Sequence, residues 1–198
     1  MKQVVVIHGG TTFAHYEDYL QSLQSKPVYV DRLTYKPMWK ELLQDNLGDE
    51  YQVLLPSMPN KTNASYKEWA LWFTNVSKVF TDDCILIGHS MGAIFLAKYL
   101  SEHTFAHRIK ATILIATPYD DESEEDLTDF KLEGITDVFR SQAGTTIVIN
   151  GDDDPVISVS DIEKYRSDLP DAEFITLPAP DHFMRVEFPE LTKRILAL

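Results

Sequence analysis

The chain has 198 residues, of which 44% are apolar and 25% are charged, a composition typical of globular proteins. Its formal net charge of −13 argues against nucleic-acid binding, and its single cysteine excludes an internal disulfide. The apolar run at 4–7 is too short for a signal peptide or a membrane span. We therefore expect one domain over residues 1–198, located in the cytoplasm, with no nucleic-acid or membrane partner.

Short segments rich in β-branched and apolar residues predict strands. They lie at 3–7, 51–55, 84–87, 109–116, 145–149 and 173–177. The segments between these strands and after the last one have apolar residues at helical spacing and predict helices or helical turns. They lie at 13–23, 37–47, 66–80, 93–100, 129–142, 158–169 and 189–196. Alternating strands and helices imply right-handed crossovers and a parallel sheet covered on both faces.

Two early segments differ in how clearly they can be interpreted. Phe13, Tyr16, Leu20 and Leu23 recur at three- and four-residue spacing, which predicts a helix with an apolar face. Segment 26–35 is compatible with either a short edge piece or an extended loop.

The sequence Gly88-His89-Ser90-Met91-Gly92 is a G-x-S-x-G pattern between a predicted strand and a predicted helix. A tight turn there would lift the Ser90 hydroxyl above the sheet, at a helix N-terminus that favours negative charge. Side chains at Gly88 and Gly92 would collide with neighbouring backbone. A plain strand–helix turn with a capping serine is the alternative. The buried strand before it and the apolar helix after it favour a nucleophile elbow.

A serine hydroxyl needs a base to take its proton, and histidine suits this because its pKa is near neutral. His182 follows the last predicted strand and is the expected base. His89 is expected to face away from the serine and pack, and His8 to brace the loop after the first strand. The other histidines are expected to face solvent: His15, His103 and His107.

A carboxylate must hold the tautomer of that histidine. The candidates after the fifth predicted strand are Asp152, Asp153 and Asp154. We favour Asp154, because the two residues after it turn the chain into the next helix, and its neighbours can serve as turn formers. Asp120 or Asp121 could also reach a histidine.

The oxyanion of a tetrahedral intermediate needs two hydrogen-bond donors. We expect one to be the backbone N–H of Met91, directly after the serine. The other is expected from Gly10, with Gly9 or Thr11 as alternatives, although the glycine pair could also form an ordinary turn. The acidic segment 120–126 is either a solvated loop or a small lid.

Together, these segments resemble the small α/β-hydrolases of the YdeN / retinoblastoma-binding-protein-9 serine hydrolase family. The resemblance covers nearly the whole chain and rests on His8-Gly9-Gly10, Met58-Pro59-Asn60, the helix with Trp69, Ile87 to Gly92, Ala116-Thr117-Pro118, Asp153 to Val156 and Asp181-His182-Phe183. It implies an α/β-hydrolase fold, with a six-stranded mostly parallel sheet of order 2-1-3-4-5-6, helices on both faces and a minimal lid. It also implies a triad of Ser90, Asp154 and His182. One departure is Asp181, where a glycine often precedes the base; it would alter the loop or place a second charge near His182.

The sequence therefore predicts a serine hydrolase, and the first hypothesis is a carboxylesterase acting on a small-molecule ester through an acyl-enzyme. No metal or organic cofactor is expected, and the chain is expected to be a monomer or a small homo-oligomer. Two alternatives stay open: an amidase, peptidase or thioesterase with the same triad, and a catalytically weak binding protein.

Overall fold

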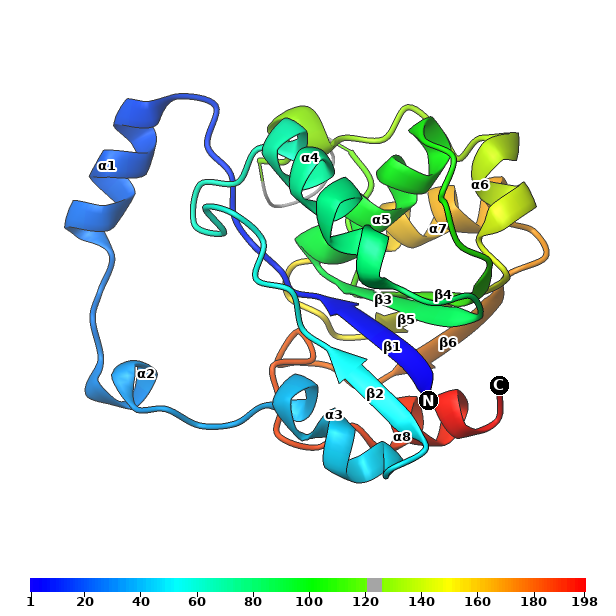
Figure 1. Cartoon of the computed structure of the whole chain (residues 1–198). Coiled ribbons are helices and arrows are strands. Elements are labelled where there is room, and N and C mark those ends of the chain that lie inside the picture. Colours follow the sequence, from blue (N-terminus) through cyan, green and yellow to red (C-terminus); the bar gives the residue numbers. More distant parts are fainter. Residues whose placement is uncertain (121–125) are drawn as a thin grey trace.

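The computed structural model describes residues 1–120 and 126–198, so most of the acidic segment 120–126 lies outside the described residues. The strands form one sheet of order β2-β1-β3-β4-β5-β6, and every neighbouring pair is parallel (Figure 1). Their bounds are β1 (Lys2–Ile7), β2 (Tyr51–Leu54), β3 (Cys84–His89), β4 (Ile109–Ile115), β5 (Thr145–Gly151) and β6 (Glu173–Leu177). The predicted strands and their order are confirmed.

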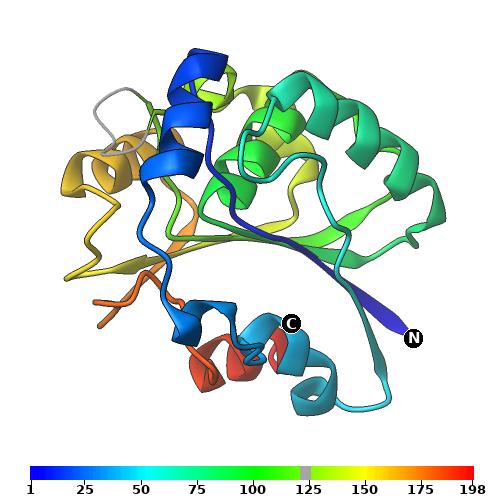
Figure 2. The same cartoon turned by 90° about the vertical axis from the view of Figure 1, so that its left-hand side faces the viewer.

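Helices cover both faces of the sheet (Figures 1 and 2). One face carries α4 (Tyr66–Val76), α5 (Met91–Glu102), α6 (Asp137–Gln142) and α7 (Val159–Asp168), and the other carries α3 (Trp39–Leu47) and α8 (Pro189–Leu196). Short 3-10 turns accompany them at η1 (Ser77–Val79) and η2 (Thr128–Phe130). None of the helices in the described ranges is long and apolar enough to span a bilayer.

The core lies on both sides of the central strands, as expected for a covered parallel sheet. The residues of β3 are all buried, and so are those of β1 after its first. An aromatic cluster joins α4 to α5, where the Trp69 ring lies 5.5 Å from that of Phe95 and 5.2 Å from that of Phe130. These contacts fix the elbow helix α5 between the sheet and α4.

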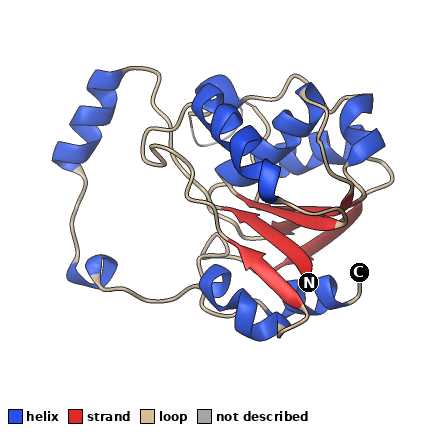
Figure 3. Ribbon diagram, in the orientation of Figure 1, coloured by secondary structure: helices blue, strands red, loops and turns tan. Residues whose placement is uncertain are grey.

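The segment after β1 differs from the expectation. Residues 13–36, which we call the arm, contain α1 (Tyr16–Ser25) and α2 (Val30–Leu33) and stand away from the sheet and its helices (Figure 3). The predicted helix forms, but none of its residues is buried, so its apolar stripe does not face the core. Segment 26–35, which was expected to be an edge piece or an extended loop, contains the short helix α2. At the other end of the chain, Leu191 and Ile195 of α8 are buried, whereas Leu196 is exposed.

Candidate active site

The turn between β3 and α5 is sterically locked at both of its glycines. A Cβ atom on Gly88 would lie 2.5 Å from the Cα of Ala93, and one on Gly92 would lie 2.6 Å from the carbonyl oxygen of His8. Ser90 between them has a φ of 55°, a left-handed conformation that is uncommon for a non-glycine residue. The predicted steric need for both glycines is confirmed, and the strained turn matches a nucleophile elbow.

Ser90 is held by its backbone at the N-terminus of α5. Its N–H donates to the carbonyl of Ile115 on β4 at 2.9 Å, and its own carbonyl accepts from the amide of Ala93 at 2.8 Å. The amide of Met91 opens the helix, where first-turn N–H groups have no acceptor within the helix. Ser90 is 6% exposed. A hydroxyl at this position therefore lies beside an amide that has no acceptor within its helix, at the positive end of a helix dipole.

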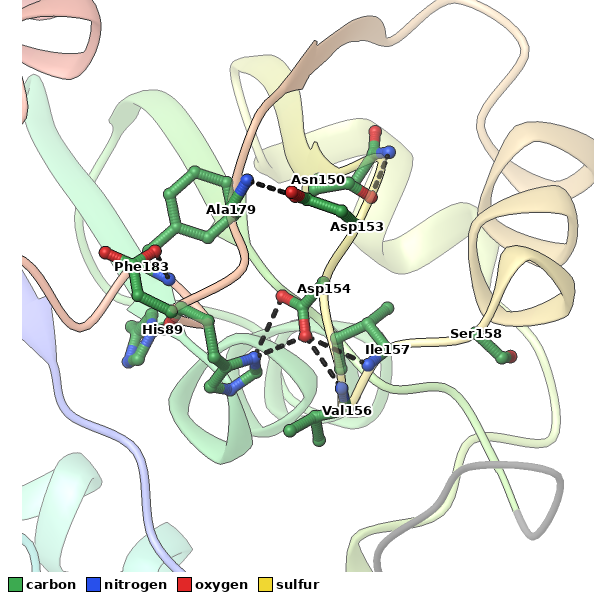
Figure 4. Close-up of polar contacts among 12 residues, drawn as sticks. His89, Asn150, Asp153, Asp154, Val156, Ile157, Ser158, Ala179 and Phe183 are labelled. Atoms are coloured by element: carbon green, nitrogen blue, oxygen red, sulfur yellow. Dashed lines mark hydrogen bonds and ion pairs between the residues drawn. The ribbon is translucent and has the colours of Figure 1, made fainter.

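His182 and Asp154 form a hydrogen-bonded pair at the carboxyl ends of the strands. The Nδ1 atom of His182 lies 2.9 Å from both carboxylate oxygens of Asp154 (Figure 4). The carboxylate is fully buried, whereas the side chain of His182 is 15% exposed. A carboxylate can only accept, so Nδ1 carries the proton and Nε2 of neutral His182 is left with its lone pair. That is the tautomer a general base requires.

Backbone amides complete the environment of Asp154. Its Oδ1 atom accepts from the N–H groups of Val156 at 2.9 Å and Ile157 at 3.2 Å (Figure 4). Burial works to raise the pKa of this carboxyl, but the hydrogen bonds from His182 and from the two amides outweigh it and hold the pKa below its usual value. The group is therefore ionised at neutral pH.

The other candidate carboxylates are engaged elsewhere. Asp153 accepts from the amide of Ala179 at 2.5 Å and so ties the loop after β5 to the loop after β6 (Figure 4). Asp120 pairs with the Nζ of Lys164 at 2.7 Å. No hydrogen bond joins Asp152 to His182 in the described ranges, and Asp121 lies outside them. The structure thus brings Asp154, among these residues, to His182.

The loop of His182 rests against the residue that precedes Ser90. The rings of His89 and His182 are 5.2 Å apart, and Nε2 of His89 lies 2.9 Å from the carbonyl oxygen of His182. The Ser90 hydroxyl makes no hydrogen bond with His182 or any other described residue. Serine–histidine hydrogen bonds are often long without substrate and tighten only when substrate is bound. His89 is buried as expected, but the sequence did not indicate that it would bond to the loop of His182.

The loop after β1 passes close to Ser90. A Cβ atom on Gly9 would lie 3.2 Å from the Cβ of Ser90, whereas one on Gly10 would lie 2.8 Å from the carbonyl oxygen of Lys61. His8 braces this loop as expected: its Nδ1 donates to the carbonyl of Gly9 at 2.7 Å, and its Nε2 accepts from the amide of Met58 at 2.9 Å. The backbone therefore approaches the serine more closely than a side chain at Gly9 would easily allow.

The possible second oxyanion donors differ in whether their amides are free. The N–H of Thr11 donates to the carbonyl of Lys61 at 2.9 Å, which removes Thr11 from the alternatives. Within the part of the chain that the structure describes, the amide of Gly10 donates no hydrogen bond. Gly10 and Gly9 therefore remain the candidates from this loop.

Asp181 does not place a free charge beside His182. Its carboxylate pairs with the guanidinium of Arg185 at 2.5 Å, and it accepts from the amide of Phe183 at 3.2 Å. The Arg185 hydrogen bond lowers the pKa of Asp181. The departure from the family pattern therefore acts on the shape of the loop.

Among the described residues, no group of three or more His, Cys, Asp or Glu side chains could hold a metal ion.

The sheet order, the elbow at the end of β3 and the late acid and histidine define an α/β-hydrolase fold. The family model described as "Serine hydrolase" matches residues 34–187, and the chain belongs to this family. The expected resemblance to YdeN-like serine hydrolases is confirmed. No curated protein matches the sequence.

Solved structures of low sequence identity share the fold. The ydeN gene product from Bacillus subtilis superimposes with a TM-score of 0.73 at 18% identity, covering 100% of this chain and 98% of its own. A thioesterase domain from the curacin biosynthetic pathway gives 0.61 at 13% identity and 98% and 91% coverage. A structure from work on carboxylesterases of the thaumarchaeon Nitrososphaera gives 0.56 at 17% identity and 99% and 88% coverage.

Proposed function

We propose that this serine hydrolase is a carboxylesterase that cleaves small carboxylic esters with Ser90 as nucleophile, His182 as general base and Asp154 as the group that orients His182. The observation that carries the proposal is the His182–Asp154 hydrogen bond, in a loop that bonds to His89, the residue before the strained Ser90 at a helix N-terminus. In this arrangement the imidazole lone pair is on Nε2 and is free to take a proton.

In the acylation step, Ser90 Oγ forms a bond to the ester carbonyl carbon while its proton passes to Nε2 of His182. The buried, ionised Asp154 stabilises the resulting imidazolium. The amides of Met91 and Gly10, with Gly9 as the alternative to Gly10, donate to the oxyanion. The intermediate then collapses: the bond to the alkoxy oxygen breaks, and His182 gives its proton to the departing alcohol.

Water reverses the sequence in the second half of the reaction. His182 takes a proton from a water molecule as the water oxygen attacks the acyl carbon of the acyl-enzyme. The bond to Ser90 Oγ breaks, Oγ recovers its proton from His182, and the carboxylic acid leaves. Every proton transfer uses the one imidazole, so no cofactor is required.

A series of p-nitrophenyl esters with increasing acyl length tests this function through release of p-nitrophenolate. Wild type is expected to turn over the short esters. His182→Ala is expected to lose on the order of 10⁴-fold or more in kcat while staying folded, because its base is gone. The control is His15→Ala, which removes an exposed histidine and should retain full turnover. Unchanged turnover in folded His182→Ala would reject its role as base.

A thioesterase is the second candidate, favoured by the structural likeness to the curacin thioesterase domain. The same serine, histidine and aspartate would act on a thioester carbonyl, with a thiol as leaving group. Esters, thioesters and anilides of one acyl group, compared by kcat/KM, separate esterase, thioesterase and amidase activity. A folded chain that binds the esters but cleaves none of these substrates would instead be a binding protein.

A further inference from the structure

The turn that carries His182 is strained at two consecutive residues. His182 has a φ of 53° and Phe183 a φ of 54°, and neither is a glycine. Bulky residues in the left-handed region persist only where the surrounding structure over-determines them. Contacts from other parts of the chain must therefore hold this turn in its conformation.

The amides of the turn are bonded within their own loop. The N–H of His182 donates to the carbonyl of Ala179 at 3.0 Å, and that of Phe183 donates to Asp181. The N–H of Met184 donates to the carbonyl of Asp181 at 2.9 Å. The loop thus satisfies its own donors, and the carbonyl groups of His182 and Phe183 need partners from outside.

Those partners come from β3 and from the first turn of α3. Nε2 of His89 donates to the carbonyl of His182 at 2.9 Å, and the indole Nε1 of Trp39 donates to the carbonyl of Phe183 at 3.0 Å. The backbone N–H of Trp39 also donates to the carbonyl of Arg185 at 3.0 Å. Successive carbonyls of the strained turn are therefore each held by a side chain from a distant part of the sequence.

Lys40 fixes the tautomer that His89 needs for this contact. Its Nζ lies 3.0 Å from Nδ1 of His89, and an ammonium group can only donate. Nδ1 must therefore be the acceptor, so the proton of neutral His89 is on Nε2, where it reaches the carbonyl of His182. Burial, together with the charge of Lys40, holds the pKa of His89 well below its usual value, which keeps the ring neutral.

The ring of His89 also lies against two other rings. It lies 5.2 Å from the ring of His182 and 6.2 Å, edge to face, from the indole of Trp39. A buried polar chain of this kind fixes one geometry, because each donor meets one acceptor. Apolar residues would fill the same space without fixing the peptide planes of the turn.

We propose that Trp39, Lys40 and His89 form a carbonyl clamp that positions the catalytic histidine. By holding the carbonyls of His182 and Phe183, the clamp sets the two peptide planes on either side of the strained turn. Those planes direct the His182 side chain toward Asp154. The effect of the clamp on turnover rests on the proposed function. Its effect on the geometry of the His182–Asp154 pair does not depend on that function.

The main test replaces His89 in two ways. His89→Leu removes both hydrogen bonds, whereas His89→Gln offers one amide donor for the His182 carbonyl and one amide oxygen for Lys40. Turnover of a p-nitrophenyl ester and the downfield proton NMR resonance of His182 Nδ1–H are measured for each variant. His15→Leu, at an exposed histidine, serves as the matched control.

We expect His89→Leu to lower kcat about 10²-fold with little change in KM, because a small misplacement of a catalytic group costs about this much. The His182 resonance should shift or broaden. His89→Gln should restore most of kcat and return the resonance toward its wild-type position. Lys40→Met should lower kcat about tenfold, and Lys40→Arg should recover it.

Unchanged kcat and resonance in folded His89→Leu would overturn the clamp, and so would equal losses in the Leu and Gln variants. If His89→Leu does not fold, Trp39→Phe, which deletes the indole N–H, and Lys40→Met are judged by the same criteria. If wild type cleaves no ester but the resonance still moves in His89→Leu, the proposed function fails and the clamp stands.

Discussion

Two regions of the molecule carry similar apolar patterns but are held very differently. The elbow helix α5 is buried along most of its length, and the loops around it are joined by backbone hydrogen bonds. In the arm, the stripe of α1 has the spacing of a core-facing helix, yet Leu20 is 47% and Leu23 is 56% exposed. Apolar spacing therefore predicts that a helix forms, but not that the core of the same chain covers it.

The contacts that each region makes with the rest of the chain explain the contrast. Among the described residues, the arm's hydrogen bonds with the rest of the chain include the backbone N–H of Ala14, which donates to the Asp126 carboxylate at 3.2 Å, and the hydroxyl pair of Tyr19 and Thr62 at 3.3 Å. The loops of the site are fixed instead by close backbone packing at Gly92 and by the buried carboxylate of Asp154. Substitutions in the site should therefore have much larger effects than substitutions in the arm.

Asp154→Asn should have the largest effect. The amide can donate to Nδ1 of His182, which would favour the wrong tautomer and place the proton on Nε2. We expect kcat for the ester to fall about 10⁴-fold, equivalent to about 5.5 kcal/mol of barrier. Steady-state kinetics, with circular dichroism to show folding, measure this. Asp152→Asn is the control, and an equal loss there would contradict the assignment of the acid.

Gly92→Ala should destabilise the fold by about 3 kcal/mol, because the new Cβ would lie 2.6 Å from the carbonyl oxygen of His8 and two backbone segments would have to separate. Gly48→Ala is the matched control. Gly48 has a φ of 77° and a ψ of −174°, a conformation that favours glycine, but no atom within 4 Å of an added Cβ, so it should cost about 1 to 2 kcal/mol from backbone strain alone. Urea unfolding compares the two. Equal losses would show that the elbow is not sterically locked.

Lys40→Met should remove a pH-dependent part of the stability. Burial lowers the pKa of Lys40 to about 8 from its ordinary value of 10.5. The folded chain therefore binds fewer protons than the unfolded chain between these values, and this difference makes wild type more stable as pH rises from about 8 to 10.5.

The Lys40→Met variant should lack that rise. The unfolding free energy of wild type minus that of the variant should therefore increase with pH by on the order of 1 to 3 kcal/mol. Urea unfolding at pH 7, 9 and 10.5 measures it. Lys67→Met, at an exposed lysine of α4, should run parallel to wild type. A Lys40→Met curve that also runs parallel would mean that the ammonium is not buried in solution.

Leu20→Ser with Leu23→Ser should have the smallest effect. Both side chains are exposed in the arm, so the unfolding free energy should change by less than about 0.5 kcal/mol and ester turnover should not change. Loss of several kcal/mol would show that the stripe packs on the body of the chain in solution, and the contrast between the two regions would then be wrong.

Local sequence patterns were enough to predict the strands, the glycines of the elbow and the histidine loop. Each of these depends on residues close together in the chain, and Gly88 and Gly92 have a steric reason that can be stated from the motif alone. The pairing of His182 with Asp154 also followed, because loops at the carboxyl ends of parallel strands gather at one edge of a sheet. The strand order came with the family resemblance rather than from any local pattern.

Contacts between distant segments were not predictable in this way. The indole of Trp39 and the carbonyl of Phe183 are 144 positions apart, and only the packing of α3 against the last loop brings them together. Trp39 lies in the predicted helix at 37–47, and the apolar spacing of that segment does not indicate a contact with the last loop. The engagement of the Thr11 amide by Lys61 likewise depends on how two loops meet.

Identification of the residue that reacts with a fluorophosphonate probe tests the central claim most directly. Peptide mapping by mass spectrometry should find the phosphonyl group on Ser90 in wild type, much slower labelling in His182→Ala, and none in Ser90→Ala. Label on another residue, or equal labelling of wild type and folded Ser90→Ala, would contradict Ser90 as the nucleophile.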